Sequence, residues 1–309
     1  MSQENNITKK QHYIPQVYLR GFSPEYLKKE KGSLPHEKYT IYCYDLTKEK
    51  QIQKPIPIKS VCYSNFLYEV TGHDGEIVLP NHLEKFFSAI EKMFSNYRHE
   101  LERKVFLEDN YKTKSFLKSG EKAFWVTYIL IQLLRTPQIL QVVAEKSLEI
   151  SESEINEKQA KNIARLFCLP FFKEIELDDR ETNIFYGLLE PIMTMSFGLG
   201  VDRRGGIITS DMPVYIYSKE FPCKEYGKII FPISSQICLF LFGGDEKKEY
   251  PKNFLFPVNE AVREEIIESI TYASFEKLYS NHSLNKQELR YINEVMKHRE
   301  EDGKGAVLL

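Results

Sequence analysis

The chain has 309 residues, and 42 lysines and arginines against 44 aspartates and glutamates give it a formal charge of -2 at pH 7. An apolar share of 42%, with 20 phenylalanines and 19 tyrosines, is typical of a folded protein with a sizeable core and excludes a disordered chain. The nearly balanced charge argues against a broad, sequence-independent grip on nucleic acid, which needs a net basic surface, although a local basic groove stays open.

The hydropathy and the cysteine spacing of the sequence also limit the class of protein. No run of about 18 apolar residues occurs and the N-terminal text "MSQENNITKKQ" is polar, so we expect a cytoplasmic protein without a membrane segment. The cysteines are odd in number, widely spaced and without a Cys-x-x-Cys pair, which predicts reduced, mostly buried thiols rather than a zinc site or a disulfide framework. They are Cys43, Cys62, Cys168, Cys223 and Cys238.

Residues 8–80 carry mostly strand patterns. The segment "YTIYCYDL" alternates apolar and polar residues, which predicts a strand. The segment "QIQKPIPIKSV" resumes the alternation, but its prolines indicate an edge strand or an extended connection. The text "SNFLYEVTGHDGEIVL" predicts a hairpin that turns between Gly72 and Gly75.

Residues 81–195 are predicted to be helical, and Asn81 is the candidate cap of the first helix. A second helix begins near Ser119 and is apolar nearly all round at its centre. We expect it in the middle of the molecule, because such a helix has no face to show to water. Pro137 should interrupt it just after Arg135.

Strand patterns return over residues 196–243, and residues 257–300 are predicted to be helical again, with the text from 259 to 281 forming one helix. We therefore predict one α+β domain that spans residues 1–309. In it, the N-terminal and C-terminal β-rich regions build a mixed or antiparallel sheet that packs on the central helical region, and the C-terminal end is helical.

The sequence lacks the signature motifs of several well-known nucleotide-binding and hydrolytic enzyme classes. It holds no Gly-x-x-x-x-Gly-Lys phosphate loop, no Gly-x-Gly-x-x-Gly, no Gly-x-Ser-x-Gly elbow and no His-Glu-x-x-His. Glu102-x-Lys104 matches the end of a nuclease signature, but it lies on a charged helix face without a paired strand carboxylate.

The stretch "KKQHYIPQVYLRGF" places polar side chains close together near the start of the chain. Ile14 precedes Pro15, which predicts an extended segment in which His12 and Gln16 share one face. Either the two side chains satisfy each other in a packed corner, or they form part of a site.

Arg135 and Gln132 lie on one face of the long apolar helix. A guanidinium at that position needs a partner, because an unpaired buried charge is very costly. Pairing with Asp211 or Glu84 is the structural interpretation, and an anion clamp for a ligand is the functional one.

The text "IITSDMPVYIY" places Ser210 and Asp211 where a buried strand meets a turn before Pro213. Serine and aspartate are ordinary turn formers there. A carboxylate at the end of a core strand is also a frequent general base or metal ligand. The histidines in polar surroundings are expected to be surface residues: His36, His73, His99, His282 and His298.

The same residues carry a family resemblance. The stretches "QHYIPQVYLRGF", "ILIQLLRTP", "IITSDMPV" and "FPISSQICLFL" resemble, in that order and spacing, the bacterial domain-of-unknown-function family numbered four-two-three-eight. The resemblance covers residues 10–282, with Met212 where the family commonly has asparagine and Ile233 in place of leucine. It implies no activity, because the family has none assigned, but it singles out His12, Gln16, Arg20, Gln132, Arg135, Ser210 and Asp211.

Two hypotheses from different classes follow. In the first, the protein is a hydrolase or transferase that acts on a phosphate-containing or nucleic-acid substrate. His12 is then the general acid/base, Asp211 a base or metal ligand, and Gln16, Gln132, Arg135 and Ser210 bind the substrate.

In the second hypothesis, the protein is a non-catalytic interaction or sensor module of a phage-defence or toxin-type system, and the polar set is a structural network. The sequence does not decide whether the protein is an enzyme. It leaves a divalent metal, a nucleotide or nucleic acid and a protein partner open, and it predicts no membrane partner.

Overall fold

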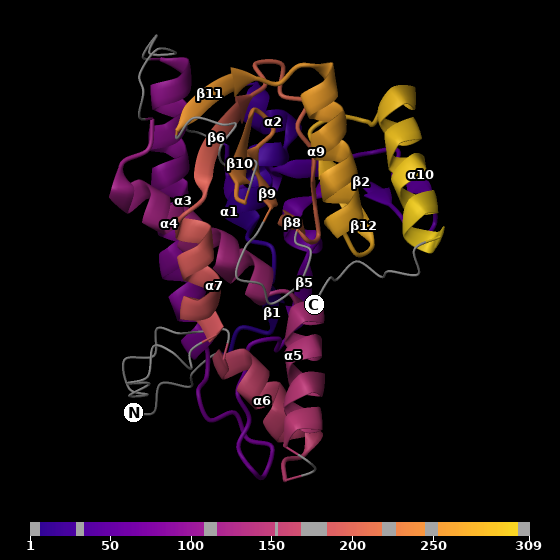
Figure 1. Cartoon of the computed structure of the whole chain (residues 1–309). Coiled ribbons are helices and arrows are strands. Elements are labelled where there is room, and N and C mark those ends of the chain that lie inside the picture. Colours follow the sequence, from indigo (N-terminus) through magenta and orange to yellow (C-terminus); the bar gives the residue numbers. More distant parts are fainter. Residues whose placement is uncertain are drawn as a thin grey trace.

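The computed structural model describes residues 7–28, 34–107, 116–151, 154–167, 184–217, 227–244 and 253–301. Within these ranges helices and strands combine as mixed and antiparallel sheets packed with helices, which confirms the predicted α+β fold. Figure 1 shows the sheets and the C-terminal helices in one part of the molecule and helices α5 and α6 at its opposite end.

The first sheet contains most of the C-terminal strands, in the order β11-β6-β10-β9-β8. Its pairs are antiparallel except for β11 with β6, which run parallel. Every residue of β6 and β10 is buried, which explains why β10 is a continuous apolar run instead of alternating apolar and polar residues. The strands are β6 (Ser196–Val201), β8 (Tyr215–Tyr217), β9 (Lys228–Ser234), β10 (Ile237–Phe242) and β11 (Phe254–Pro257).

The second sheet joins strands from the two ends of the chain, in the order β3-β2-β12-β7, with β4 also paired to β2. It brings N-terminal and C-terminal strands into one sheet, as predicted. The strands are β2 (Thr40–Asp45), β3 (Lys50–Gln51), β4 (Ile56–Pro57), β7 (Thr209–Ser210) and β12 (Lys277–Ser280).

Strand β12 lies in text that we predicted to be one helix, and this prediction was wrong. Helix α9 ends at Ala273, and Ser274 is extended, with φ -66° and ψ 153°. The backbone N–H groups that follow, from Phe275 to Lys277, donate to the Asp211 carboxylate instead of continuing the helix. The Asp211 carboxylate, which comes from a distant part of the chain, thus accepts the N–H groups that a longer helix would have bonded to its own carbonyls.

The long helices surround these sheets. Helix α4 has ten buried residues and occupies the centre, as predicted, and its Tyr128 ring lies 6.0 Å from the Phe231 ring of β9. Pro137 is the first residue of α5, so α4 and α5 meet at a bend of 72°. The helices are α3 (His82–Phe106), α4 (Ser119–Leu134), α5 (Pro137–Ile150), α6 (Glu157–Phe167), α7 (Ile184–Met193), α9 (Glu260–Ala273) and α10 (Lys286–Glu301).

Among the described residues, no single helix is long and apolar enough to cross a membrane. Helices α4 and α5 reach that length and composition only together, as a bent pair.

The N-terminal segment differs from its predicted form. Strand β1 (Lys10–His12) pairs with β5 (Tyr63–Asn65), but the extended stretch ends there. Pro15 caps a short helix, because its φ of -58° suits a helix start, and Gln16 is already helical. Short turns of helix follow: α1 (Gln16–Leu19), η1 (Arg20–Phe22), α2 (Pro24–Leu27), η2 (His36–Lys38) and η3 (Ile58–Ser60).

Candidate functional site

Arg135 is the most completely enclosed of the predicted site residues. Its side chain is 2% exposed, and Nη1 donates to Glu91 Oε1 at 3.1 Å. Nη2 donates to the His12 carbonyl at 2.6 Å, and Nε donates to the Tyr68 hydroxyl at 3.3 Å. The Phe87 ring covers the guanidinium at 4.0 Å. Each nitrogen of the fork therefore has a partner within the protein.

The carboxylate partner of Arg135 is Glu91, and not Asp211 or Glu84 as we expected. Burial opposes the charge of Arg135, but the neighbouring Tyr68 and Glu91 outweigh burial and raise its pKa above the ordinary value. The guanidinium therefore stays protonated in the interior.

Gln132 acts beside Arg135 on the same face of α4, as predicted. Its Nε2 donates to the Tyr13 carbonyl at 3.0 Å, while Arg135 takes the preceding carbonyl, that of His12. Helix α4 thus holds two successive peptide groups of the N-terminal segment. We call Arg135, Gln132, Glu91 and Tyr68, together with the backbone of residues 12–13, the N-terminal clamp.

His12 and Gln16 come together, although by a different route from the one predicted. Gln16 Nε2 lies 3.5 Å from His12 Nδ1, across the turn at Pro15. His12 Nε2 is shielded from solvent and has no hydrogen-bond partner among the described residues. Burial lowers the pKa of His12, and the positive charges of Arg135 and Lys10 add to this against an opposing contact with the Lys59 backbone. The fold therefore favours the neutral imidazole.

Asp211 occupies a different place, at the end of β7. Its carboxylate is buried and accepts backbone N–H groups from Phe275 at 2.9 Å, Glu276 at 2.9 Å and Lys277 at 3.1 Å. Burial raises the pKa of Asp211 to about 6 against the lowering effect of these hydrogen bonds. Within the described part of the chain, no hydrogen bond or ion pair joins Asp211 to His12.

Ser210 makes the turn that the sequence predicts before Pro213. Its Oγ donates to the Met212 carbonyl at 2.7 Å and accepts from the Met212 N–H at 3.1 Å. The predicted polar residues thus separate into one set around α1 and α4 and another on β7. The first set contains His12, Gln16, Gln132 and Arg135, and the second contains Ser210 and Asp211.

Sequence reasoning missed Glu91 and Tyr68. The signal for Glu91 is its spacing from Glu84 and Phe87 on α3, which places all three on the face that packs on the core side. Glu84 is half-buried and burial raises its pKa. Arg20 is half-buried as well, lies 5.9 Å from the Tyr39 ring, and its guanidinium has no hydrogen bond or ion pair among the described residues.

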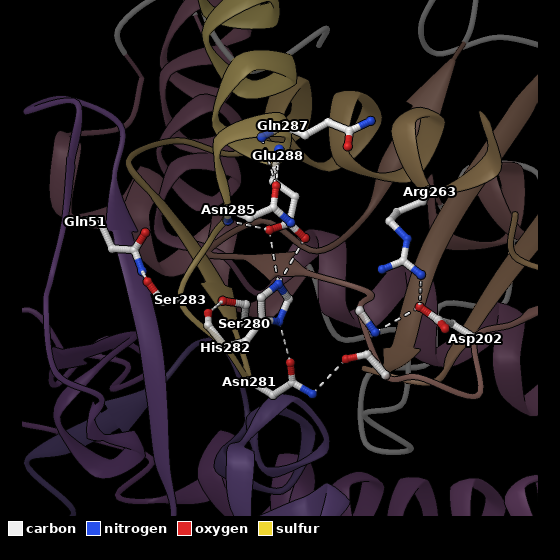
Figure 2. Close-up of polar contacts among 12 residues, drawn as sticks. Gln51, Asp202, Arg263, Ser280, Asn281, His282, Ser283, Asn285, Gln287 and Glu288 are labelled. Carbon is white, nitrogen blue, oxygen red and sulfur yellow. Dashed lines mark hydrogen bonds and ion pairs between the residues drawn. The ribbon is translucent and has the colours of Figure 1, made fainter. Parts of the chain in front are cut away.

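A further polar cluster lies at the other end of the second sheet (Figure 2). His282 Nε2 is 3.0 Å from Glu288 Oε1, and His282 Nδ1 is 2.7 Å from Asn281 Oδ1. The Asn281 amide is fixed in this orientation because its Nδ2 donates to the Gly205 carbonyl at 2.8 Å. Asn285 caps α10 by accepting from the Glu288 N–H at 3.0 Å. We call Asn281, His282, Asn285 and Glu288 the C-terminal clasp.

The clasp connects the end of β12 to helix α10. Each ring nitrogen of His282 has an oxygen within hydrogen-bond distance, Asn281 Oδ1 at Nδ1 and Glu288 Oε1 at Nε2, and Glu288 belongs to α10. His282 is partly exposed, and it is a member of a hydrogen-bond network rather than a lone surface residue.

No group of three or more His, Cys, Asp or Glu side chains among the described residues is arranged to hold a metal ion.

Comparison with known proteins gives one match. The family model for "Protein of unknown function (DUF4238)" matches residues 10–284, which is most of the chain and confirms the resemblance seen in the motifs. No curated protein and no solved structure matches the chain.

Proposed function

The chain belongs to the DUF4238 family of unknown function, and from this premise we propose that it is a non-catalytic interaction module, of the kind that works in a phage-defence or toxin-type system. The observation that carries the proposal is the state of Arg135. Its guanidinium is 2% exposed and its donors are taken by Glu91, Tyr68 and the His12 carbonyl. An anion clamp must offer donors to a ligand, and this side chain offers them to the fold.

The other polar residues support the same role. Gln132 is buried and holds the Tyr13 carbonyl, and Asp211 is buried under three backbone N–H groups. Removing either partner of such a buried contact leaves a polar group without a hydrogen-bond partner, which lowers the free energy of unfolding by about 1–3 kcal/mol. These residues therefore have a structural reason to be polar, without a substrate.

A second candidate function is a hydrolase or transferase acting on a phosphate-containing or nucleic-acid substrate, with His12 and Asp211 as catalytic groups. One observation favours this class of activity. Glu84 and Arg20 are both half-buried, Glu84 and His12 both feel the charge of Arg135, and Arg20 makes no hydrogen bond or ion pair among the described residues. A half-buried acid and a cation without a partner are groups that a phosphate ester would engage.

Complementation at two temperatures separates the two functions. His12→Asn and Asp211→Asn are expressed in a strain that lacks the gene, with the exposed residues His99→Asn and Asp74→Asn as matched controls. A structural role predicts that both test variants melt below the wild-type temperature and regain wild-type complementation when the cells grow well below those melting points.

Catalysis predicts the opposite pattern. Loss of complementation would persist in the cold while circular dichroism shows an intact fold, and that result would overturn the interaction-module proposal. Thermal stabilisation of the wild-type protein by a nucleotide or a divalent cation would identify the module as a sensor.

A further inference from the structure

A groove of about 580 Å³ lies between the end of β5 and helices α5 and α6. One wall is the chain from Ser64 to Leu67, and the floor is the apolar face of α5, with Leu140, Ala144 and Leu148. Figure 1 shows α5 and α6 at the end of the molecule next to β1 and β5. The groove uses none of the residues of the N-terminal clamp or the C-terminal clasp.

The wall of the groove contains an open strand edge. In the two-stranded sheet, β5 pairs with β1 alone. The Phe66 N–H donates to the Lys9 carbonyl and the Tyr13 N–H donates to the Cys62 carbonyl, both at 2.9 Å. Because antiparallel ladders alternate, the peptide groups of Asn65 point away from β1. No hydrogen bond from the described residues reaches the Asn65 backbone, which lines the groove.

Phe66 stands at the mouth of the groove in an unusual conformation. Its φ is 54°, in the left-handed region that is an outlier for a bulky residue. The side chain is 41% exposed although it is apolar. Strain of this kind persists at positions where a binding or switching role keeps it. Phe66 directly follows the last residue of β5 and lines the groove together with residues of α5.

The groove also holds a positive charge without a carboxylate partner. Arg165 is half-buried; its Nε donates to the Leu67 carbonyl at 2.9 Å and its Nη1 to Asn162 Oδ1 at 3.2 Å. No ion pair from the described residues reaches it, and burial lowers its pKa. Lys161 lies one helical turn away, is 62% exposed, and is 3.9 Å from Glu157.

Two acidic residues also line the groove, and neither forms an ion pair with Arg165. Glu157 is 82% exposed, and Glu145 is exposed and accepts from Gln141 at 2.8 Å. A carboxylate brought by a ligand would complement Arg165 and Lys161, and charge-assisted contacts to a partly buried arginine are the strong ones.

We propose that this groove binds an extended peptide segment of a protein partner. The segment adds a short strand at Asn65, places an apolar side chain on the α5 floor beside Phe66, and directs an acidic side chain at Arg165 and Lys161. This inference rests on the interaction-module function and names the binding site and the chemistry of the partner.

Selection from a library of short random peptides, displayed on mRNA and presented to the full chain, tests the proposal. We expect the enriched peptides to share an acidic position next to a bulky apolar one. Their binding should slow the hydrogen exchange of the Asn65 amide, because that N–H gains an acceptor. Absence of enrichment, or an Asn65 amide that exchanges as before, would overturn the proposal.

Several single variants test which side chains of the groove bind the peptide, so the test does not depend on the folding of any one variant. Arg165→Gln and Lys161→Gln should each weaken the affinity of an enriched peptide by about tenfold. Lys146→Gln is the matched control, since it removes the same charge from α5 outside the groove. Equal affinity of the peptide for all of these variants and the wild type would contradict the proposed site.

Phe66→Asn separates binding from stability. Asparagine tolerates the left-handed conformation better than phenylalanine, so the melting temperature should not fall, while the peptide affinity should drop several-fold. Unchanged affinity in this variant would also refute the proposed position of the apolar side chain.

Failure of the peptide proposal is distinguishable from failure of the proposed function. The interaction-module role is decided by the complementation of His12→Asn and Asp211→Asn at two temperatures. The groove is decided by peptide selection and by the Asn65 amide.

Discussion

The N-terminal clamp and the C-terminal clasp use similar chemistry in different surroundings. Each contains a basic side chain held by a glutamate and by a second oxygen. The Arg135 side chain is 2% exposed in the clamp, whereas the His282 side chain is 34% exposed in the clasp. The clamp joins segments more than a hundred residues apart, while the His282–Glu288 pair is local. Burial of the basic side chain, and not the type of contact, should therefore set how much each cluster stabilises the fold.

The largest effect is expected on removing the buried cation. Arg135→Met should lower the free energy of unfolding by about 3 kcal/mol, because it leaves Glu91 without its partner and the His12 carbonyl without its donor. Urea denaturation measures this change. Arg290→Met, which breaks an exposed pair with Glu294 on α10, should change it far less, because solvent screens that pair. Similar losses in the two variants would show that burial does not set the difference.

The pH dependence of stability should distinguish two buried titratable groups, His12 and Asp211. The pKa of His12 is lowered in the fold, so the unfolded chain binds more protons as the pH falls below 6.5 and the wild type loses stability there. The pKa of Asp211 is raised to about 6 from 3.8, so the folded protein binds more protons between these values and gains stability as the pH falls.

Single variants should separate these opposite contributions. Relative to the wild type, His12→Asn should become more stable as the pH falls below 6.5. Asp211→Asn should become less stable, relative to the wild type, as the pH falls from about 6 toward 3.8. The measurement is urea denaturation over a series of pH values. Stability curves that run parallel to that of the wild type would contradict both assignments.

The smallest effect is expected in the clasp. Glu288→Gln keeps an oxygen for the Asn285 N–H but removes the charge that faces His282, and should lower the free energy of unfolding by about 1 kcal/mol. Glu294→Gln on the exposed side of α10 is the matched control. A loss as large as that of Arg135→Met would show that the exposure of the basic side chain does not set the difference between the clusters.

Some features of the fold could be predicted because they depend on local patterns. The buried helix α4 and the break at Pro137 follow from an uninterrupted apolar run and from a residue that lacks an N–H. The turn at Ser210 follows from the hydrogen bonds that a serine makes with its own neighbours.

Local sequence patterns were therefore enough to predict the α+β class, the central helix and the set of polar residues. The partners of those polar residues depend on the tertiary fold. Arg135 pairs with Glu91, 44 residues away, and Asp211 ends α9 by binding Phe275, 64 residues away. Apolar periodicity is a property of adjacent residues, whereas the partner of a buried charge depends on which distant segments the packed core brings together.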